Sequence, residues 1–129
     1  MTERRLVSSG GPYETRYGYS RAIAVGDSCW VAGTTDLGPD GTSLHPGDAA
    51  AQARAAFAIV IRALGDAGFG VEDVVLTRMY IVRPGDAPEV AAVNGEVFGE
   101  IRPAATLVVV AGLIDPSVLV EIEAEARRS

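Results

Sequence analysis

The stretch from residue 101 to 126, IRPAATLVVVAGLIDPSVLVEIEAEA, constrains the fold most, because it predicts two strands joined by a turn. The first strand, residues 105–111, is almost wholly apolar and rich in valine. That composition is typical of a strand that is covered on both faces. Gly112 and the Asp115-Pro116 pair break the pattern and predict the turn. The chain is therefore expected to end inside a β-sheet.

The second strand, residues 118–126, alternates apolar side chains with Glu121, Glu123 and Glu125. Because successive side chains of a strand point to opposite faces, the apolar set faces a core and the carboxylates share the other face. The plain interpretation of the acidic set is a solvated outer surface. The alternative is that one carboxylate lies in a cleft and transfers protons.

Composition limits the classes of function. A chain of 129 residues, 48% hydrophobic and 22% charged, is expected to form one globular domain over residues 1–129. The net charge is −6, and all eleven basic residues are arginines spread along the chain. Phosphate binding needs clustered basic side chains, so no nucleic-acid partner is expected.

Neither a membrane nor a metal is expected as a partner. No apolar run approaches the about 20 residues that cross a bilayer, and the start, MTERRLVSSG, is unlike a signal peptide. A cytoplasmic location is therefore the expectation. His45 is the one histidine and has no acidic, Cys or His partners at ligand spacing, so no metal site is predicted. Cys29 is expected to be a small buried hydrophobe rather than a nucleophile.

The rest of the chain alternates strands and helices. The predicted helices are residues 49–67, with Asp48 as N-cap, and a second that begins at Asp86 with Glu89 in a capping-box arrangement. Residues 12–18 are interpreted as a loop. The predicted strands before the tail are residues 5–9, 21–25, 28–32 and 74–82. The last of these is apolar on both faces apart from Arg78, so it is expected to be central, and Arg78 needs an acidic partner or solvent.

This order predicts an α+β fold, in which a mixed sheet of about six strands carries two helices on one face. The opposite face of such a sheet still needs cover, which self-association commonly supplies.

The motifs at both ends resemble a known family. R-P-A-x-T at residues 102–106 and L-V-E-I-E-A at 119–124 are similar to the C-terminal pattern of the Rid family (reactive intermediate deaminase, also called YjgF or endoribonuclease L-PSP). The stretch G-Y-S-R-A at 18–22, with V-G-D at 25–27 and V-A-G at 31–33, resembles its N-terminal signature. The likeness extends over roughly residues 17–126.

The resemblance implies a chorismate-mutase-like fold and a homotrimer with small-molecule sites in clefts between subunits. It also implies a hydrolase, a deaminase that converts 2-imino acids or enamines, released by pyridoxal-phosphate enzymes, to 2-keto acids and ammonia without a cofactor of its own. Four residues match positions of the family site. They are Tyr19 near the cleft, Gly33 whose backbone lines it, Asn94 on the second helix, and Glu123, which would position the attacking water.

One position departs from the family. The active deaminases read P-A-R-[ST], whereas Ala105 stands here where the arginine would hold the substrate's carboxylate. Arg102 and Arg78 are conceivable replacements. A third possibility is a ligand without a carboxylate, which the apolar run that starts at Leu107 would suit.

Three functions follow as hypotheses. The favoured one is an imine or enamine deaminase whose substrate preference is altered by Ala105. The second is a non-catalytic trimer that binds small molecules, or regulates, through the same clefts. The third, RNA cleavage or inhibition of translation, is suggested only by the family's older name, and the acidic composition argues against it.

Overall fold

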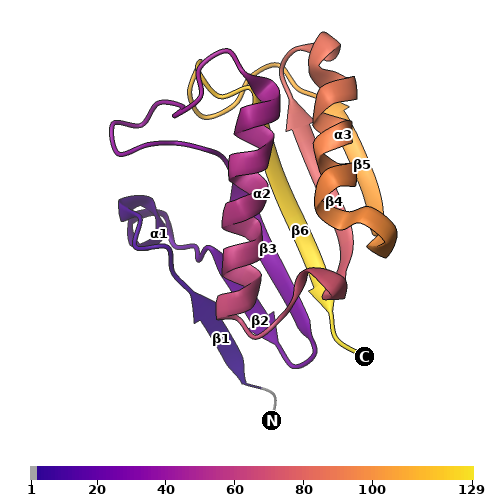
Figure 1. The fold of residues 1–129 in the computed structure, drawn as a ribbon. Coiled ribbons are helices and arrows are strands. Elements are labelled where there is room, and N and C mark those ends of the chain that lie inside the picture. The colour runs from indigo at the N-terminus through magenta and orange to yellow at the C-terminus, as the bar shows by residue number, and fades with distance from the viewer. Residues whose placement is uncertain (1–2) are drawn as a thin grey trace.

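The computed structural model describes residues 3–129, and its six strands form one sheet in the order β1-β2-β3-β6-β4-β5 (Figure 1). All neighbouring strands are antiparallel except β4 and β5, which are parallel. The strands are β1 Arg4–Val7, β2 Ala22–Val25, β3 Ser28–Thr34, β4 Val74–Ile81, β5 Ala104–Val109 and β6 Val120–Arg127. The mixed six-stranded sheet predicted from the sequence is therefore confirmed.

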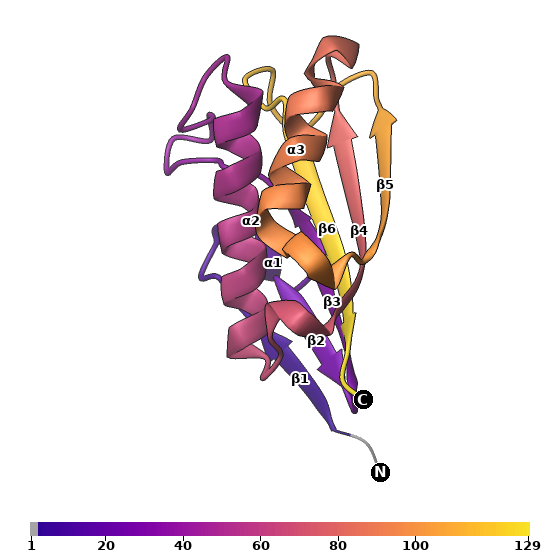
Figure 2. The same cartoon turned by 45° about the vertical axis from the view of Figure 1, so that its right-hand side comes forward.

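Two long helices, α2 (Ala49–Asp66) and α3 (Ala87–Phe98), cover one face of the sheet, as predicted. Figure 2 shows both on the same side, in front of β6 and β4. Short 3-10 turns span Val71–Asp73, Pro84–Asp86 and Gly99–Ile101. The core lies between helices and sheet, where the rings of Phe57 and Phe98 join α2 to α3 edge-to-face, with centroids 5.6 Å apart.

Helix α2 forms where the sequence predicted it. Asp48 is its N-cap, because its Oδ1 accepts a hydrogen bond of 3.0 Å from the amide of Ala51. Its buried stripe is rich in alanine, which lets the helix lie close to the sheet. Gly68 follows the helix with φ of 89°, a conformation that glycine adopts without strain.

Two local predictions were wrong. Residues 12–18 are not a loop, because Pro12–Tyr17 forms the short helix α1. Glu14 is buried there and accepts hydrogen bonds from Ser9, which ties the helix to the end of β1. Asp86 starts α3 but does not cap it, since its carboxylate binds Arg83 Nε at 2.7 Å instead.

The apolar strand near the C-terminus is not covered on both faces within one chain. β5 lies at the edge of the sheet, where β4 is its one partner strand among the described residues. The crossover through α3 brings it alongside β4, and the helices do not extend over it completely. Val109, which pairs with the buried Ile81 on the helix side, is 51% exposed, and Val108, which pairs with Tyr80 on the open face, is 40% exposed. β4 itself lies between β6 and β5, inside the sheet as predicted.

The alternation predicted for β6 is confirmed. Val120, Ile122, Ala124 and Ala126 are each at most 2% exposed and pack under the helices. The sheet face turned away from α2 and α3 is called the open face below. It carries the carboxylates of β6, together with Arg78 and Tyr80 of β4 and Trp30 of β3. Among the described residues, no helix combines the length and apolar character required to span a membrane.

Candidate functional site

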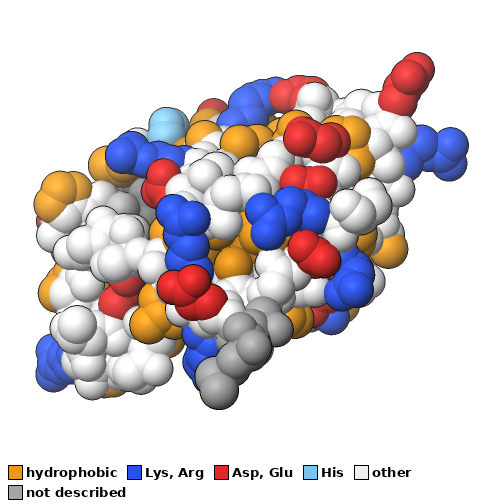
Figure 3. Space-filling view, turned by 90° about the horizontal axis from the view of Figure 1, so that it is seen from below, with side chains coloured by type: hydrophobic (Ala, Val, Ile, Leu, Met, Phe, Trp, Pro, Cys, Tyr) orange, Lys and Arg blue, Asp and Glu red, His pale blue; other side chains and the backbone are white. Residues whose placement is uncertain are grey.

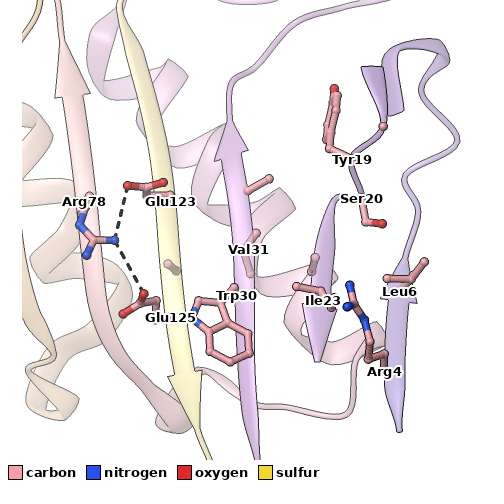
Figure 4. Close-up of a pocket in the computed structure, with 14 residues that line it drawn as sticks. Arg4, Leu6, Tyr19, Ser20, Ile23, Trp30, Val31, Arg78, Glu123 and Glu125 are labelled. Atoms are coloured by element: carbon pink, nitrogen blue, oxygen red, sulfur yellow. Dashed lines mark ion pairs between the residues drawn. The ribbon is translucent and has the colours of Figure 1, made fainter. Parts of the chain in front are cut away.

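A groove of about 510 Å3 runs across the open face (Figure 4). Its walls come from β1, β2, β3, β6 and β4 and from the segment before β2. Tyr19 lies at one end of it, Trp30 along its floor, and Arg78 beside Glu123 on the side of β4. The groove therefore combines aromatic surface with charged groups that have opposite signs.

Glu123 belongs to a cluster on the β4 side of the groove. The hydroxyl of Tyr80 donates a hydrogen bond to its Oε1, and Arg78 Nη1 lies 3.5 Å from the same atom. Arg78 also lies 3.9 Å from Glu125, so two carboxylates surround its charge (Figure 4). The hydrogen bond to Glu123, with burial, raises the pKa of Tyr80. Arg78 was predicted to need an acidic partner or solvent, and it has two acidic partners.

Glu121 lies in a different setting, two residues earlier on the same face of β6. Its carboxyl group lies against Gly33 of β3, at the place where a side chain of residue 33 would begin. Burial raises the pKa of Glu121, the positive charge of Arg21 offsets part of this effect, and Glu123 adds to it. Glu121 therefore favours the protonated state more than a solvated glutamate does, as is typical of carboxyls that transfer protons.

Arg21 completes this part of the open face. Its Nη2 donates a hydrogen bond of 2.6 Å to the carbonyl of Gly33. Its Nε is buried and has no acceptor among the described residues. The guanidinium carbon lies 5.9 Å from the centre of the Tyr19 ring, within range of a cation–π interaction. Tyr19, Arg21, Gly33 and Glu121 are called the Gly33 cluster below.

Three of the predicted site residues lie on the helix side of the sheet. Asn94 of α3 accepts a hydrogen bond of 3.0 Å from the hydroxyl of Thr77, which is buried under that helix. In the register of β4 and β5, Ala105 is opposite Thr77 and Leu107 is opposite Met79. Paired residues of neighbouring strands share a face, so Ala105 and Leu107 belong to the side that carries α3.

The structure therefore divides the predicted residues into three sets. Tyr19 and Gly33 come together in the Gly33 cluster, and Arg78 with Glu123 forms an ion pair farther along the same face. Asn94, Ala105 and Leu107 lie behind the sheet. A single site that used both faces would need two copies of the chain.

Sequence reasoning missed Arg21 and Glu121. The alternation of β6 placed all three carboxylates on one face, but it could not tell which one meets the end of β3. Gly33 was the sequence feature that could have indicated this contact, since a glycine within a strand often marks a close approach of another group.

Within residues 3–129, no three His, Cys, Asp or Glu side chains are grouped as metal ligands. His45 Nδ1 lies 3.0 Å from the buried carboxylate of Asp36. Cys29 is fully buried, and burial raises the pKa of its thiol. A thiol in that setting is a poor nucleophile.

Surface charge is mixed at the end of the molecule where both termini lie. Figure 3 shows basic and acidic side chains interspersed there, with hydrophobic side chains between them. Arg128, for example, lies 4.0 Å from Asp27 and donates hydrogen bonds to the carbonyls of Gly26 and Gly68. An interspersed surface of this kind differs from the basic patch that nucleic-acid binding uses.

The family model described as endoribonuclease L-PSP matches residues 12–128. Rv2704 of Mycobacterium tuberculosis, a solved member of the YjgF/YER057c/UK114 family, is 44% identical, with a TM-score of 0.88 over 98% of this chain and 100% of that one. An uncharacterized protein of Streptomyces coelicolor is 41% identical over 96% of this chain and 92% of its own length. The 3-aminoacrylate deaminase RutC of Acinetobacter baylyi is 33% identical over 84% of this chain and 85% of its own.

The family model and the structural match extend over most of the chain, and the TM-score of 0.88 shows that the fold is shared with Rv2704. The resemblance predicted from the two terminal motifs is thereby confirmed, and the chain belongs to the endoribonuclease L-PSP family, also called the YjgF or Rid family.

Proposed function

We propose that this protein hydrolyses reactive imines or enamines to a carbonyl compound and ammonia. The observation that carries the proposal is the carboxyl group of Glu121, which lies against Gly33 with a raised pKa. The relative named 3-aminoacrylate deaminase supports the same class of reaction. Ala105 supports a substrate preference that differs from that of relatives with an arginine at this place.

The reaction needs proton transfer and a water molecule, and a single carboxyl group can supply the proton steps. Glu121 in its neutral form gives a proton to the β-carbon of an enamine, which becomes an iminium ion. The resulting carboxylate then takes a proton from water as the water oxygen bonds to the iminium carbon. The hydroxyl proton of the carbinolamine is then transferred to its nitrogen. The C–N bond breaks, and the carbonyl compound and ammonia are released. Every step is acid–base chemistry, so the reaction requires no redox cofactor.

Glu123 remains the catalytic residue that the sequence predicts, and its neighbours support a role in orienting water. Tyr80 and Arg78 hold its carboxylate at a fixed place on the open face. Side chains two residues apart on a strand are roughly 6.5–7 Å apart, so Glu121 and Glu123 can contact opposite ends of a small substrate. In this proposal Glu121 transfers protons, and Glu123 positions the water or the substrate nitrogen.

We also propose that the site is assembled between subunits of a homotrimer. Two observations support this assembly. The edge strand β5 exposes the apolar side chains of Val108 and Val109, which favours contact with another chain. Asn94, Ala105 and Leu107 lie on the opposite side of the sheet from Glu123, so a cleft that contains all four draws on two chains. Light scattering coupled to size-exclusion chromatography would test the stoichiometry, and a monomer at micromolar concentration would contradict it.

The function is tested by following imine loss directly. An amino-acid oxidase generates a panel of 2-imino acids, imines without a carboxylate are added separately, and semicarbazide traps whatever survives. The wild-type protein should accelerate the loss, while Glu121→Gln and Glu123→Gln should each slow it at least about 100-fold. Glu96→Gln is the matched control, because Glu96 pairs with Arg54 in solvent on the helix side. Binding of a keto acid without any turnover would instead favour the non-catalytic binding protein.

A further inference from the structure

The charges of the open face are unequally compensated. Arg78 is surrounded by Glu123 and Glu125 within 4 Å. Arg21, by contrast, forms no ion pair with any acidic side chain of residues 3–129. Its side chain is half-buried, which weakens the screening of its charge by water. Its charge favours the ionised forms of Glu121 and Glu14, but neither carboxylate lies within ion-pair distance, so the guanidinium can still bind an anion directly.

The guanidinium of Arg21 also has hydrogen-bond donors to spare. Arginine carries five N–H donors in a rigid plane. The structure shows one hydrogen bond from this group to residues 3–129, from Nη2 to the carbonyl of Gly33. That bond fixes one edge of the group beside Gly33 and leaves Nη1 without a hydrogen bond to residues 3–129. Two parallel N–H groups of an arginine match the two oxygens of a carboxylate.

Gly33 brings this cation next to the carboxyl group of the proposed reaction. Arg21 binds the carbonyl of Gly33, the carboxyl group of Glu121 lies where a Cβ of the same residue would be, and the charge of Arg21 acts on that carboxyl group. In a 2-imino acid the reacting carbon is bonded directly to the carboxylate carbon, at about 1.5 Å. A substrate whose carboxylate is held by Arg21 therefore has its reacting carbon close to Glu121.

We propose that Arg21 holds the carboxylate of the substrate, so that this protein acts on imines and enamines that carry a carboxylate next to the reacting carbon. The assignment rests on the proposed function and specifies its substrate class. It makes Arg21 the specificity-determining residue and leaves position 105 without that role. A bound carboxylate also places a second negative charge near Glu121, which favours the protonated form that the first step needs.

The competing explanation is that Arg21 has a purely structural role and ties the start of β2 to β3. In that case, replacing Arg21 should affect all substrates equally. Arg21→Gln separates the two, because glutamine can still donate to the Gly33 carbonyl but carries no charge. Loss of a charge-assisted pair should lower kcat/KM for 2-iminobutanoate about 10- to 100-fold, mainly through KM. With butan-2-imine, in which a methyl group replaces the carboxylate, the same variant should show only the smaller effect of the lost charge on the pKa of Glu121.

Arg54→Gln is the matched control, since it removes an exposed arginine on α2 and should change neither rate. Thermal melting of each variant reports whether the fold is retained. An equal loss for both substrates, or no loss for either, would overturn the assignment of Arg21.

A binding experiment tests the role of Arg21 independently of the proposed function. If wild type accelerates the loss of no imine, isothermal titration with 2-oxobutanoate and with butanone tests Arg21 alone. Binding of 2-oxobutanoate that weakens at least about 10-fold in Arg21→Gln supports the anchor without catalysis. Equal binding by both proteins, or no binding by wild type, contradicts it.

Discussion

The carboxyl group of Glu121 occupies the place where a side chain at Gly33 would begin. Glycine at residue 33 leaves room for this carboxyl group, and backbone conformation does not call for it, since its φ is outside the left-handed region that favours glycine. The contact between Glu121 and Gly33 explains why β3 contains a glycine, a residue that weakens the interior of a strand. It also links the end of β3 to the chemistry proposed for β6.

Gly33→Ala should displace the Glu121 carboxyl while the fold is retained. The added methyl group meets the flexible end of one side chain, so the cost in stability is small, whereas a misplaced catalytic group can cost about 100-fold in rate. Steady-state kinetics with 2-iminobutanoate, together with the melting temperature, would measure both effects. Gly65→Ala in α2 is the control, because no atom lies within 4 Å of the new Cβ and alanine favours the helix by about 0.5–1 kcal/mol. Unchanged activity in Gly33→Ala would mean that the position of Glu121 is unimportant.

Glu121→Gln should stabilise the protein at neutral pH. Burial raises the folded-state pKa of Glu121 above its ordinary value of 4.5, so the folded state holds this proton more tightly than the unfolded chain does. The ionised carboxyl therefore costs stability as the pH rises from 4.5 through the raised pKa, and glutamine avoids this cost. Melting temperatures should be higher for the variant at pH 7, and the difference should shrink as the pH falls to about 4.

Glu96→Gln should show the opposite sign, because hydrogen bonding to Arg54 lowers the pKa of Glu96. Its contribution to stability is present at neutral pH and is lost as the pH falls through that lowered value. A Glu121→Gln protein that melts below wild type at pH 7 would refute the proposed environment of Glu121.

Glu123→Gln should make Tyr80 more acidic. The carboxylate of Glu123 accepts a hydrogen bond from the phenol hydroxyl and repels the phenolate charge, and both effects raise the pKa of Tyr80 above its ordinary value of 10.0. A neutral amide removes the repulsion, so tyrosinate absorbance should develop at lower pH in the variant. Tyr80→Phe identifies which part of the titration belongs to this residue. Identical titrations for wild type and Glu123→Gln would exclude the coupling.

Gln52→Leu should destabilise the fold by at least about 2 kcal/mol. Gln52 is fully buried, donates to the carbonyls of His45 and Ser117, and accepts from the amide of Leu119. Leucine leaves the buried amide of Leu119 without a partner and removes a donor from the part-buried carbonyls of His45 and Ser117. Urea unfolding would measure the loss, and a midpoint equal to that of wild type would show that the loops rearrange to satisfy these groups.

Much of the fold could be predicted from local pattern. The alternation of β6 and the alanine-rich period of α2 each follow from the spacing of apolar residues, and both were correct. The short helix α1 was missed because it depends on a contact between Glu14 and Ser9 outside it. The exposure of β5 was missed because an apolar run does not reveal which molecule covers it.

The candidate site was predictable only in part, for a similar reason. Spacing placed three glutamates on one face, but the contact with Gly33 and the charge of Arg21 distinguish Glu121 from Glu123. Both depend on how β3 and β2 lie beside β6. The family resemblance supplied Tyr19, Gly33, Asn94 and Glu123, and their grouping into one cleft remains a prediction about the assembled protein.

The central claim is that the carboxyl group of Glu121 on the open face of β6 transfers the protons of imine hydrolysis, and the most direct test is the rate of 2-iminobutanoate loss with wild type, Glu121→Gln and Glu123→Gln. The account predicts faster loss with wild type and a fall of at least about 100-fold in Glu121→Gln, with the melting temperature retained or raised. Full activity in Glu121→Gln, or no acceleration of any imine by wild type, would contradict it.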